Sequence, residues 1–504
     1  MLKRTYLLRT IKLLALIAAF VLIFLGLQEL LRYKFVFRFE ETPETEMWEN
    51  FYELPGNSTD ILFLGSSHVY NDVNPMLIYE ESQIKGFDLS TSNQDFFASF
   101  HLLREALKTQ KPRVVALESF GFFQTPFYAE DYDKSSYYKM AFDDMHISGN
   151  KLDAVMEWKK NTGDIKVMER LFPLLDYHSR WNELYPVDFE SDVLRSVLLG
   201  YACSDKSAGK YDYSGYGRDN IEETSPFADS TMAYFEKIYN LCADNDIELV
   251  IFTSPEVFPN AGNYLAVERL AADLDIPYIN YNYADIYESL GIDGATDWRD
   301  PSHLNMYGAP KFSRKLIADI SEITGLLPSD GNEVFYADKV EKYHKLTGTL
   351  TLAKENDFEK YIETLAESDY AVFIVAKDEA FGGLSDDVKA KLQKLTPGVD
   401  YSDCYGRSFY AVCENGSCIY DMDTRILEHE GALSDGSAYY LASVGFYAGA
   451  ENGVSFAEVE INGQGCCINE NGLNFVVYNT VTDEIVDSCM FATFSEEKMV
   501  FRLQ

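Results

Sequence analysis

Ser67, Asp300 and His303 have the side-chain types that nucleophilic catalysis requires. Ser67 follows a short apolar run, residues 60–64, and a tight turn at Gly65. A strand that stops at Gly65 presents a hydroxyl at the carboxyl edge of a sheet, where open α/β folds bind their ligands. Serine alone is a poor nucleophile, so it needs a base within hydrogen-bond reach and a third group that fixes the tautomer of that base. Asp300 and His303 can supply both groups.

Each of these two short motifs has an ordinary explanation when it is taken alone. Gly-Ser-Ser occurs by chance in many loops, and an isolated Asp-x-x-His is more often a helix N-cap with a surface histidine. His68, next to Ser67, more often packs or bonds locally than takes part in chemistry. Because both motifs occur here in order, flanked by a strand and by an apparent helix, we interpret them as one site.

The paired motifs resemble those of the SGNH/GDSL hydrolase superfamily. The first block of that family is a strand followed by Gly-x-Ser, here residues 65–67, and its last block is Asp-x-x-His, here residues 300–303. The resemblance implies an α/β fold of the flavodoxin-like type, with three layers around a parallel sheet, and neither a metal nor a cofactor. It assigns the nucleophile to Ser67, the general base to His303 and the orienting carboxylate to Asp300.

The sequence departs from the family where the oxyanion donors are expected. Members usually use the serine amide, a glycine after the second strand and an asparagine in a Gly-x-Asn-Asp block. Here Ser90 stands in place of the glycine, and Glu118-Ser-Phe-Gly replaces the asparagine block. The amide of Ser90 can still donate, since that donor belongs to the backbone. Asn93 and Gln94 are the candidates to replace the asparagine; the alternative is that they cap the following helix.

Residues 13–31 are predicted to form a transmembrane anchor. An apolar run between basic flanks continues as helix to Leu31, and nineteen residues at about 1.5 Å each cross a hydrocarbon core of about 30 Å. The alternative is a cleaved secretory signal, but no small-x-small site follows Leu27. We therefore expect a single-pass protein of the cell membrane, with residues 1–12 as a basic cytoplasmic tail and the bulk outside the cell.

Composition narrows the classes of partner. The formal charge of −38 opposes binding to nucleic acid or to other polyanions. Six of the eight cysteines fall in the last hundred or so residues, which is compatible with disulfides in an exported domain, although their connectivity cannot be read from the sequence. No Cys/His spacing indicates a zinc site.

The chain divides into a linker and two domains in this interpretation. Residues 32–56 are acidic and contain Pro and Gly, so they are predicted to be an exposed tether. Residues 57–326 alternate apolar strands with helical stretches, which predicts a parallel sheet covered on both faces. The alternation of strands and helices stops at about residues 121–226, and we interpret this segment as a helical insertion near the catalytic edge. Within it, Arg180 could meet an anionic or acyl-donor group, whereas Trp181 is more simply explained by packing.

Residues 327–504 are predicted to form a β-rich α+β domain. Its motifs, at residues 370–380 and 472–478 among others, resemble the interleukin-like domain of epithelial–mesenchymal transition inducers, also called the ILEI domain. In that family the second motif normally comes before the first, so the reversed order suggests a circular permutation. If the motifs belong to one domain, both segments must be strands of a single sheet, with a helix over 385–395 packed on it. The resemblance also implies glycan binding.

The variant blocks are similar to those of membrane-tethered members that work beside multi-spanning O-acyltransferases in bacterial envelopes. By that resemblance we expect a serine O-acyltransferase or acylesterase acting on a cell-envelope glycan or acylated polysaccharide. The rival hypothesis is a non-catalytic glycan-binding or scaffold protein that partners a membrane-bound O-acyltransferase and lacks a competent oxyanion hole.

Overall fold

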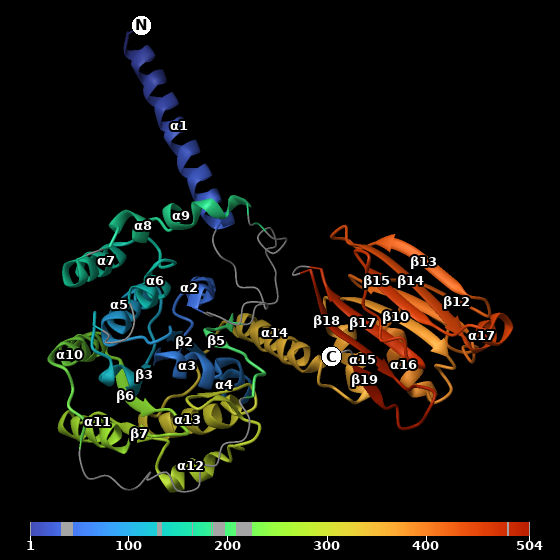
Figure 1. Cartoon of the computed structure of the whole chain (residues 1–504). Coiled ribbons are helices and arrows are strands. Elements are labelled where there is room, and N and C mark those ends of the chain that lie inside the picture. The colour runs from blue at the N-terminus through green and yellow to red at the C-terminus, as the bar shows by residue number, and fades with distance from the viewer. Residues whose placement is uncertain are drawn as a thin grey trace. The chain divides into compact units, whose positions relative to one another are not determined.

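The computed structural model describes residues 2–31, 44–128, 134–163, 165–182, 184, 197–207, 224–480 and 483–502. The chain divides into two units, residues 1–343 and 344–504, and each is described by itself (Figure 1). Helix α14 (Glu333–Leu352) contains the point of division.

A parallel sheet forms the centre of the first unit. Its strands are arranged in the order β2-β1-β3-β6-β7, and all neighbouring pairs are parallel. This order is of the flavodoxin-like type, in which ligands bind where the strand order reverses, beside β1 and β3. The predicted parallel α/β sheet is therefore confirmed. The strands are β1 (Ile61–Gly65), β2 (Gly86–Ser90), β3 (Val114–Glu118), β6 (Glu248–Thr253) and β7 (Tyr278–Asn280).

Helices cover both faces of this sheet (Figure 1). Helices α3, α4 and α13 pack against one another, and α5 packs against α10. Because β1 and β3 are buried along their whole length, they contain almost no polar side chains. The helices of the unit are α3 (Ser67–Asp72), α4 (Pro75–Ser82), α5 (Phe96–Ala106), η1 (Ser119–Phe123), α10 (Asp229–Asp244), α11 (Ala261–Asp273), α12 (Ala284–Leu290) and α13 (Ala309–Thr324).

Helix α1 (Leu2–Leu31) is the N-terminal helix of this unit. Its window Arg9–Gln28 has a mean hydropathy of 2.6 and is not buried by the rest of the protein. The helix is therefore long and apolar enough to cross a membrane. Residues 32–43 lie outside the described part of the chain.

The prediction that residues 44–56 belong to an exposed tether is wrong. Residues Glu44–Glu53 form helix α2, and its side chains Met47, Trp48 and Phe51 are buried. The ring of Phe51 contacts Phe87 of β2 edge to face, with 5.3 Å between ring centroids. Acidic residues between these apolar positions obscured a helix that has one buried face.

The insertion after β3 is helical in part, and its helices pack away from the serine. Helix α6 contacts α2 and α5, α7 contacts α5, and α9 contacts α1. Only the later segment of the insertion, 201–207, reaches the predicted site within the described residues, where Met306 N donates to Ser204 O at 2.9 Å. Its elements are α6 (Ser135–Phe142), α7 (Gly149–Thr162), α8 (Val167–Leu171), α9 (Leu174–Tyr177), η2 (His178–Asn182), β4 (Val197–Leu198) and β5 (Tyr201–Ala202).

The second unit is built on a large, mostly antiparallel sheet, as the prediction of a β-rich domain requires. Its strands run β16-β15-β14-β10-β17-β18-β19; β11 also pairs with β10, β12 pairs with β11, and β13 pairs with β14. They are β10 (Ala371–Asp378), β11 (Ser408–Glu414), β12 (Ser417–Asp423), β13 (Leu427–Ala432), β14 (Ala438–Gly445), β15 (Ala457–Ile461), β16 (Gln464–Gly465), β17 (Gly472–Asn479), β18 (Glu484–Phe491) and β19 (Val500–Arg502). The helices are α15 (Phe358–Glu367), α16 (Asp386–Leu395) and α17 (Phe446–Asn452).

The two segments that suggested a permuted domain are neighbours in this sheet. Strand β10 pairs with β17 antiparallel from Ala371 opposite Tyr478 to Lys377 opposite Gly472. Helix α16 shares a buried cluster with both strands. The requirement of a single sheet carrying that helix is met. Cys413 and Cys418 are joined by a disulfide between β11 and β12, whereas Cys404, Cys466 and Cys489 are free and buried.

Candidate active site

Ser67 is the first residue of α3, immediately after the end of β1. The connection is tight because β1 and β3 approach each other closely there. A Cβ at Gly65 would lie 2.6 Å from Glu118 Cβ and 2.7 Å from a methyl of Val69, so only glycine fits without a shift. The turn directs the two following serines differently: Ser66 is fully buried, whereas Ser67 is half-buried.

The structure brings Ser67, His303 and Asp300 together in one hydrogen-bonded line. Ser67 Oγ lies 2.8 Å from His303 Nε2. On the other side of the ring, His303 Nδ1 lies 2.9 Å from both carboxylate oxygens of Asp300. This geometry fits a serine whose proton can pass to an imidazole that a carboxylate holds in the correct tautomer.

Asp300 is held in its ionised form. Burial by itself raises the pKa of this carboxyl, but the hydrogen bonds and charge of His303 and the amide of Ser302 outweigh burial and lower the pKa below its ordinary value. Asp300 and His303 lie on the two short strands β8 (Trp298–Asp300) and β9 (His303–Leu304), which form a hairpin. The Asp-x-x-His motif is thus a strand turn and not a helix N-cap.

Two further contacts fix this hairpin against α3. Arg299 Nη1 donates to Asn71 Oδ1 at 2.8 Å, and Leu304 N donates to Asp72 Oδ1 at 2.7 Å. Asp72 is fully buried, and burial raises the pKa of its carboxyl well above the ordinary value. The helix that carries Ser67 and the hairpin that carries His303 are therefore joined at three points, although they are far apart in the sequence.

The loop after β9 is anchored by Asn305. Its amide donates to Lys206 O and Thr296 O, and its side-chain oxygen accepts from the amides of Tyr307 and Gly308. A Cβ at Gly308 would lie 2.4 Å from Asp297 O, so the close approach of these backbones requires glycine. Helix α13 then begins at Ala309, as the sequence predicted.

A second polar cluster lies beside the triad. Ser66 Oγ lies 3.1 Å from His68 Nδ1 and donates to Glu118 Oε2 at 3.5 Å. The other nitrogen of His68, Nε2, is 3.6 Å from Glu256 Oε1. The rings of His68 and His303 are close, with 5.1 Å between centroids. His68 thus bonds locally to Ser66, as expected, but it also lies beside two acids, Glu118 and Glu256, from distant parts of the sequence.

Burial keeps His68 and Glu118 largely uncharged near neutral pH. Burial, together with the nearby His303, lowers the pKa of His68 to about 3, so the ring stays neutral. Burial raises the pKa of Glu118 to about 8, partly opposed by the amide of Phe120, which donates to the carboxyl at 3.0 Å. Glu118 is therefore largely a neutral acid near neutral pH.

The three residues predicted to bind the oxyanion differ in whether they have a free hydrogen-bond donor. Ser90 ends β2 and lies opposite Gly65 in the sheet, next to the serine turn. Asn93 lies in the turn that follows β2, with a left-handed backbone (φ 46). Gln94 is buried, and its Nε2 already donates to Ser99 Oγ at 3.0 Å and to Leu89 O at 3.3 Å. Gln94 is thus excluded as a donor, and the helix cap is Asp95.

Arg180 does not lie at the site, contrary to the sequence-based suggestion. It is buried and donates from Nη1 to Leu31 O at 3.2 Å, at the C-terminal end of α1. A positively charged guanidinium at this position interacts favourably with the negative C-terminal end of the helix dipole. Trp181, expected to pack, is 70% exposed. The N-terminal helix explains the position of Arg180, and no local pattern in the sequence predicts that this helix lies beside the insertion.

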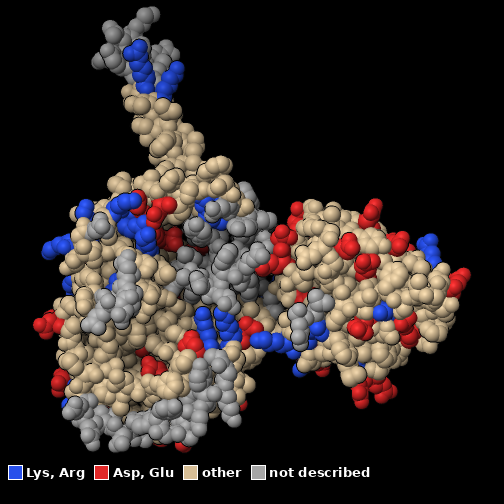
Figure 2. All heavy atoms as spheres, viewed as in Figure 1, with Lys and Arg blue, Asp and Glu red and all other residues tan. Residues whose placement is uncertain are grey.

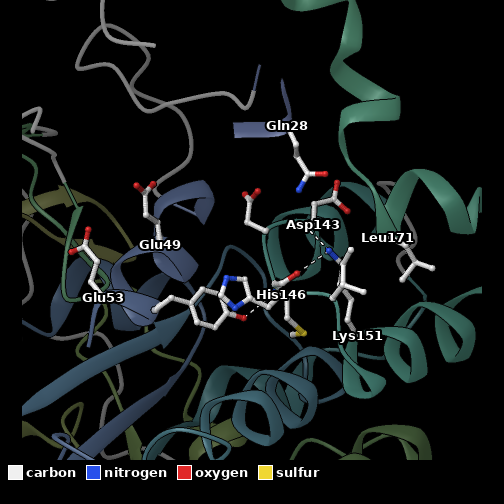
Figure 3. A pocket seen from close by; sticks show the side chains of 11 residues that line it. Gln28, Glu49, Glu53, Asp143, His146, Lys151 and Leu171 are labelled. Atoms are coloured by element: carbon white, nitrogen blue, oxygen red, sulfur yellow. Dashed lines mark hydrogen bonds between the residues drawn. The ribbon is translucent and has the colours of Figure 1, made fainter. Parts of the chain in front are cut away.

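A separate cavity of about 790 Å³ lies between α1, α2 and the α6–α7 turn (Figure 3). The His146 ring stacks on Tyr52 with 3.5 Å between centroids, and Lys151 Nζ donates to Met145 O at 2.9 Å. None of the three triad residues lines this cavity. Among the described residues no group of His, Cys, Asp and Glu is arranged to hold a metal ion.

Sequence reasoning identified the triad and missed the groups that support it. Asp72, Asn71 and Glu256 were not singled out, because each is an ordinary polar residue until the fold brings its partner near. Glu118 carried one usable signal: it is an acid at the end of an otherwise apolar strand, which is unusual for a buried position.

No family model matches the chain, and neither does any curated protein. Among solved structures, the chain is similar to a Bacteroides fragilis protein assigned provisionally as an acylhydrolase. The identity is 12% and the TM-score 0.27, over 56% of this chain and 100% of the other. It is also similar to a GDSL-like lipase from Bacteroides thetaiotaomicron, with 11% identity and a TM-score of 0.26 over 56% and 98% of the two chains. Likenesses this weak say nothing about chemistry, which must come from the geometry of the site.

Proposed function

We propose that the protein is a serine esterase or acyltransferase of the SGNH type that forms an acyl-enzyme on Ser67. The observation that carries this proposal is the continuous line from Ser67 Oγ through His303 to Asp300, with 2.8 Å and 2.9 Å between successive atoms. The line lies at the carboxyl edge of a parallel sheet, where substrates of this fold type have access.

In the proposed reaction, Ser67 Oγ attacks the carbonyl carbon of an ester while its proton passes to His303 Nε2. The tetrahedral intermediate places its negative oxygen near the end of β2, where the backbone amide of Ser90 is the candidate donor. When the ester C–O bond breaks, His303 returns the proton to the leaving alcohol. Water or a sugar hydroxyl then gives its proton to His303 and attacks the acyl carbon; when the bond to Ser67 Oγ breaks, His303 returns that proton to Ser67 Oγ and the resting enzyme is restored.

A fluorophosphonate probe tests this proposal without knowledge of the natural substrate. We expect the full-length protein to be labelled, and the Ser67→Ala and His303→Ala proteins to lose labelling and hydrolysis of a simple acetyl ester. Ser66→Ala is the matched control, because Ser66 is buried one residue away and should not be the nucleophile. Labelling that persists in Ser67→Ala and disappears in Ser66→Ala would overturn the assignment.

The alternative is a non-catalytic glycan-binding or scaffold protein that partners a membrane-bound O-acyltransferase. Its specific support is the absence of the family's Gly-x-Asn-Asp block, which Glu118-Ser-Phe-Gly121 replaces. A protein of this kind would fold with the triad geometry intact and would still resist the probe. Absence of labelling in a folded parental protein therefore favours the alternative.

We further propose that the substrate is an acylated cell-envelope glycan and that the second unit binds the polymer. Exposed aromatic side chains support this: Tyr405, Phe446 and Tyr447 are 56%, 49% and 44% exposed. Tyr447 lies close to both of the others, with ring centroids 6.4 Å and 5.9 Å away. Gathered exposed aromatics mark binding surfaces. A bound chain would raise the local concentration of acyl groups near Ser67.

A glycan array with the full-length protein tests the binding step. We expect retention of a neutral or amino-sugar polymer, since the protein is strongly acidic, and loss of retention in Tyr405→Ala/Tyr447→Ala. Phe501→Ala is the control, because Phe501 is similarly exposed, at 48%, but lies on strand β19 and not on the loop and helix α17 that carry the three aromatics. Absence of binding by the folded parental protein would refute the glycan proposal and leave the esterase proposal standing.

A further inference from the structure

Exposed apolar side chains gather in the helical insertion beside the end of α1. Between residues 134 and 182, in the part that the structure describes, six large apolar or aromatic side chains are 43–70% exposed: Ile147, Leu152, Met156, Met168, Leu175 and Trp181. Helix α7 contacts α8, α8 contacts α9, and α9 continues into η2 (Figure 1). We call residues 147–182 the α7–η2 surface. Exposed apolar side chains concentrated in one region mark an interaction site.

Contacts with α1 set the level of this surface relative to a membrane. Phe172 packs edge to face on Phe24, with 5.8 Å between ring centroids, and Arg180 binds the carbonyl of Leu31. Phe24 lies four residues before Gln28, the end of the apolar window, and therefore about 6 Å inside that end. If α1 spans a bilayer, as proposed from its length and composition, Phe172 lies at the boundary between headgroups and acyl chains.

The charge of this region also differs from the rest of the protein. Residues 134–182 contain eight Lys/Arg and seven Asp/Glu, a net charge of +1, in a chain whose net charge is −38. Two of the acids, Asp143 and Asp176, form salt bridges with the buried Arg170. Lys159 and Lys160 are exposed at the end of α7. Figure 2 shows blue side chains gathered over the part of the molecule that Figure 1 labels α7 and α8.

We propose that the α7–η2 surface lies in the interface of a bilayer that contains anionic phospholipid. Interfacial helices bury their apolar side chains about 5–10 Å into the boundary region, which agrees with the level of Phe172. Trp181 is an aromatic residue of the kind that concentrates at this level. Lys159 and Lys160 face lipid phosphates, which attract lysine near an anionic surface. This proposal rests on the proposed membrane span and is independent of the esterase chemistry.

Tryptophan fluorescence of the full-length protein in vesicles tests the proposal directly. All four tryptophans lie in the described part of the chain; Trp48, Trp158 and Trp298 are at most 1% exposed, whereas Trp181 is 70% exposed. The emission that disappears in Trp181→Phe therefore belongs to Trp181. In vesicles of phosphatidylcholine and phosphatidylglycerol with brominated acyl chains, we expect this emission to fall about twofold, as for a residue at interfacial depth. Aqueous iodide should quench it poorly.

Charge reversal separates lipid attraction from simple proximity. Lys160→Glu should weaken the bromolipid quenching of Trp181 in vesicles with phosphatidylglycerol and have little effect in phosphatidylcholine alone. Arg269→Glu is the matched control, because Arg269 is an exposed cation on α11, far from α1 in Figure 1. Equal effects of the two variants would show that Lys160 is not specifically attracted to anionic lipid.

The outcomes distinguish this proposal from those on which it rests. Resistance of the full-length protein to alkaline extraction shows that α1 is inserted. If the protein is inserted but Trp181 is untouched by bromolipid and open to iodide, the surface faces water or awaits a protein partner, and the lipid proposal is wrong. If the protein is extracted, the span and this surface fail together, while probe labelling of Ser67 still reports on the esterase.

Discussion

At the level of single residues, the surroundings of two adjacent serines decide which of them can react. Ser66 is fully buried and bonded to His68 and Glu118, whereas Ser67 is half-buried and bonded to His303. A nucleophile needs both a base and access for the substrate, and Ser67 has both. The Gly-x-Ser pattern pointed to Ser67, but only the structure shows the different burial and partners of the two serines.

Asp300→Asn should reduce turnover strongly without unfolding the protein. The amide keeps the shape of the carboxylate but has no negative charge to stabilise protonated His303 and can favour the wrong tautomer of the ring. We expect kcat for an acetyl ester to fall by about 10²- to 10⁴-fold with a smaller change in KM. Steady-state kinetics and a parental circular dichroism spectrum check this. Parental kcat in the variant would remove Asp300 from the triad.

Glu118→Gln should change how stability depends on pH. The pKa of Glu118 is raised from 4.5 to about 8 in the folded state, so folding favours the protonated acid. This contribution is fully present below pH 4.5 and is lost as the pH rises to about 8. Between pH 4.5 and about 8, we expect the free energy of unfolding of the parental protein to fall by about 3–5 kcal/mol relative to that of Glu118→Gln. Urea unfolding at both ends measures it; parallel profiles would contradict the raised pKa.

At the level of elements, the site depends on how α3 is joined to the β8–β9 hairpin. The hairpin is only a few residues long and has little core of its own. Its position therefore depends on contacts with α3, from Ser67, Asn71 and Asp72. The three contacts come from one short helix, so a movement of α3 would displace the nucleophile and the base together.

Asp72→Ala should lower kcat, and Asp72→Asn should largely restore it. Alanine leaves the buried amide of Leu304 without its acceptor, which costs about 1–3 kcal/mol and loosens the hairpin that carries His303. Asparagine keeps an acceptor oxygen in the same place. Acetyl-ester kinetics and urea unfolding of both variants check this. Equal losses of kcat in the two variants would show that charge, and not position, is what Asp72 supplies.

At the level of the whole molecule, the second unit should fold by itself. Residues 344–504 contain two buried clusters, one on each side of the sheet, and both draw residues from β10 and β17. We expect this fragment to unfold in one urea transition, whereas residues 344–425 or 426–504 alone should not fold, because neither buries enough apolar surface to offset its chain entropy. Cooperative unfolding of either half alone would contradict a single domain.

Local pattern was sufficient for the strand that leads to the nucleophile. The apolar run at residues 60–64 placed β1 within about a residue of its observed limits, because a strand buried on both faces must be apolar along its length. The same reasoning failed for α2, since a short helix with one buried face between acidic residues resembles an exposed segment.

The sequence by itself determined which residues could form the triad, because a Gly-x-Ser after a strand and an Asp-x-x-His before a helix rarely occur by chance in that order. The tertiary structure alone decided that Asn71 and Asp72 bind the hairpin that carries His303, that Glu118 and Glu256 lie beside His68, and that Arg180 binds the end of α1. Each of these contacts joins segments far apart in the chain. Burial and partners, which set both the pKa values and the access to a side chain, exist only after those segments have packed together.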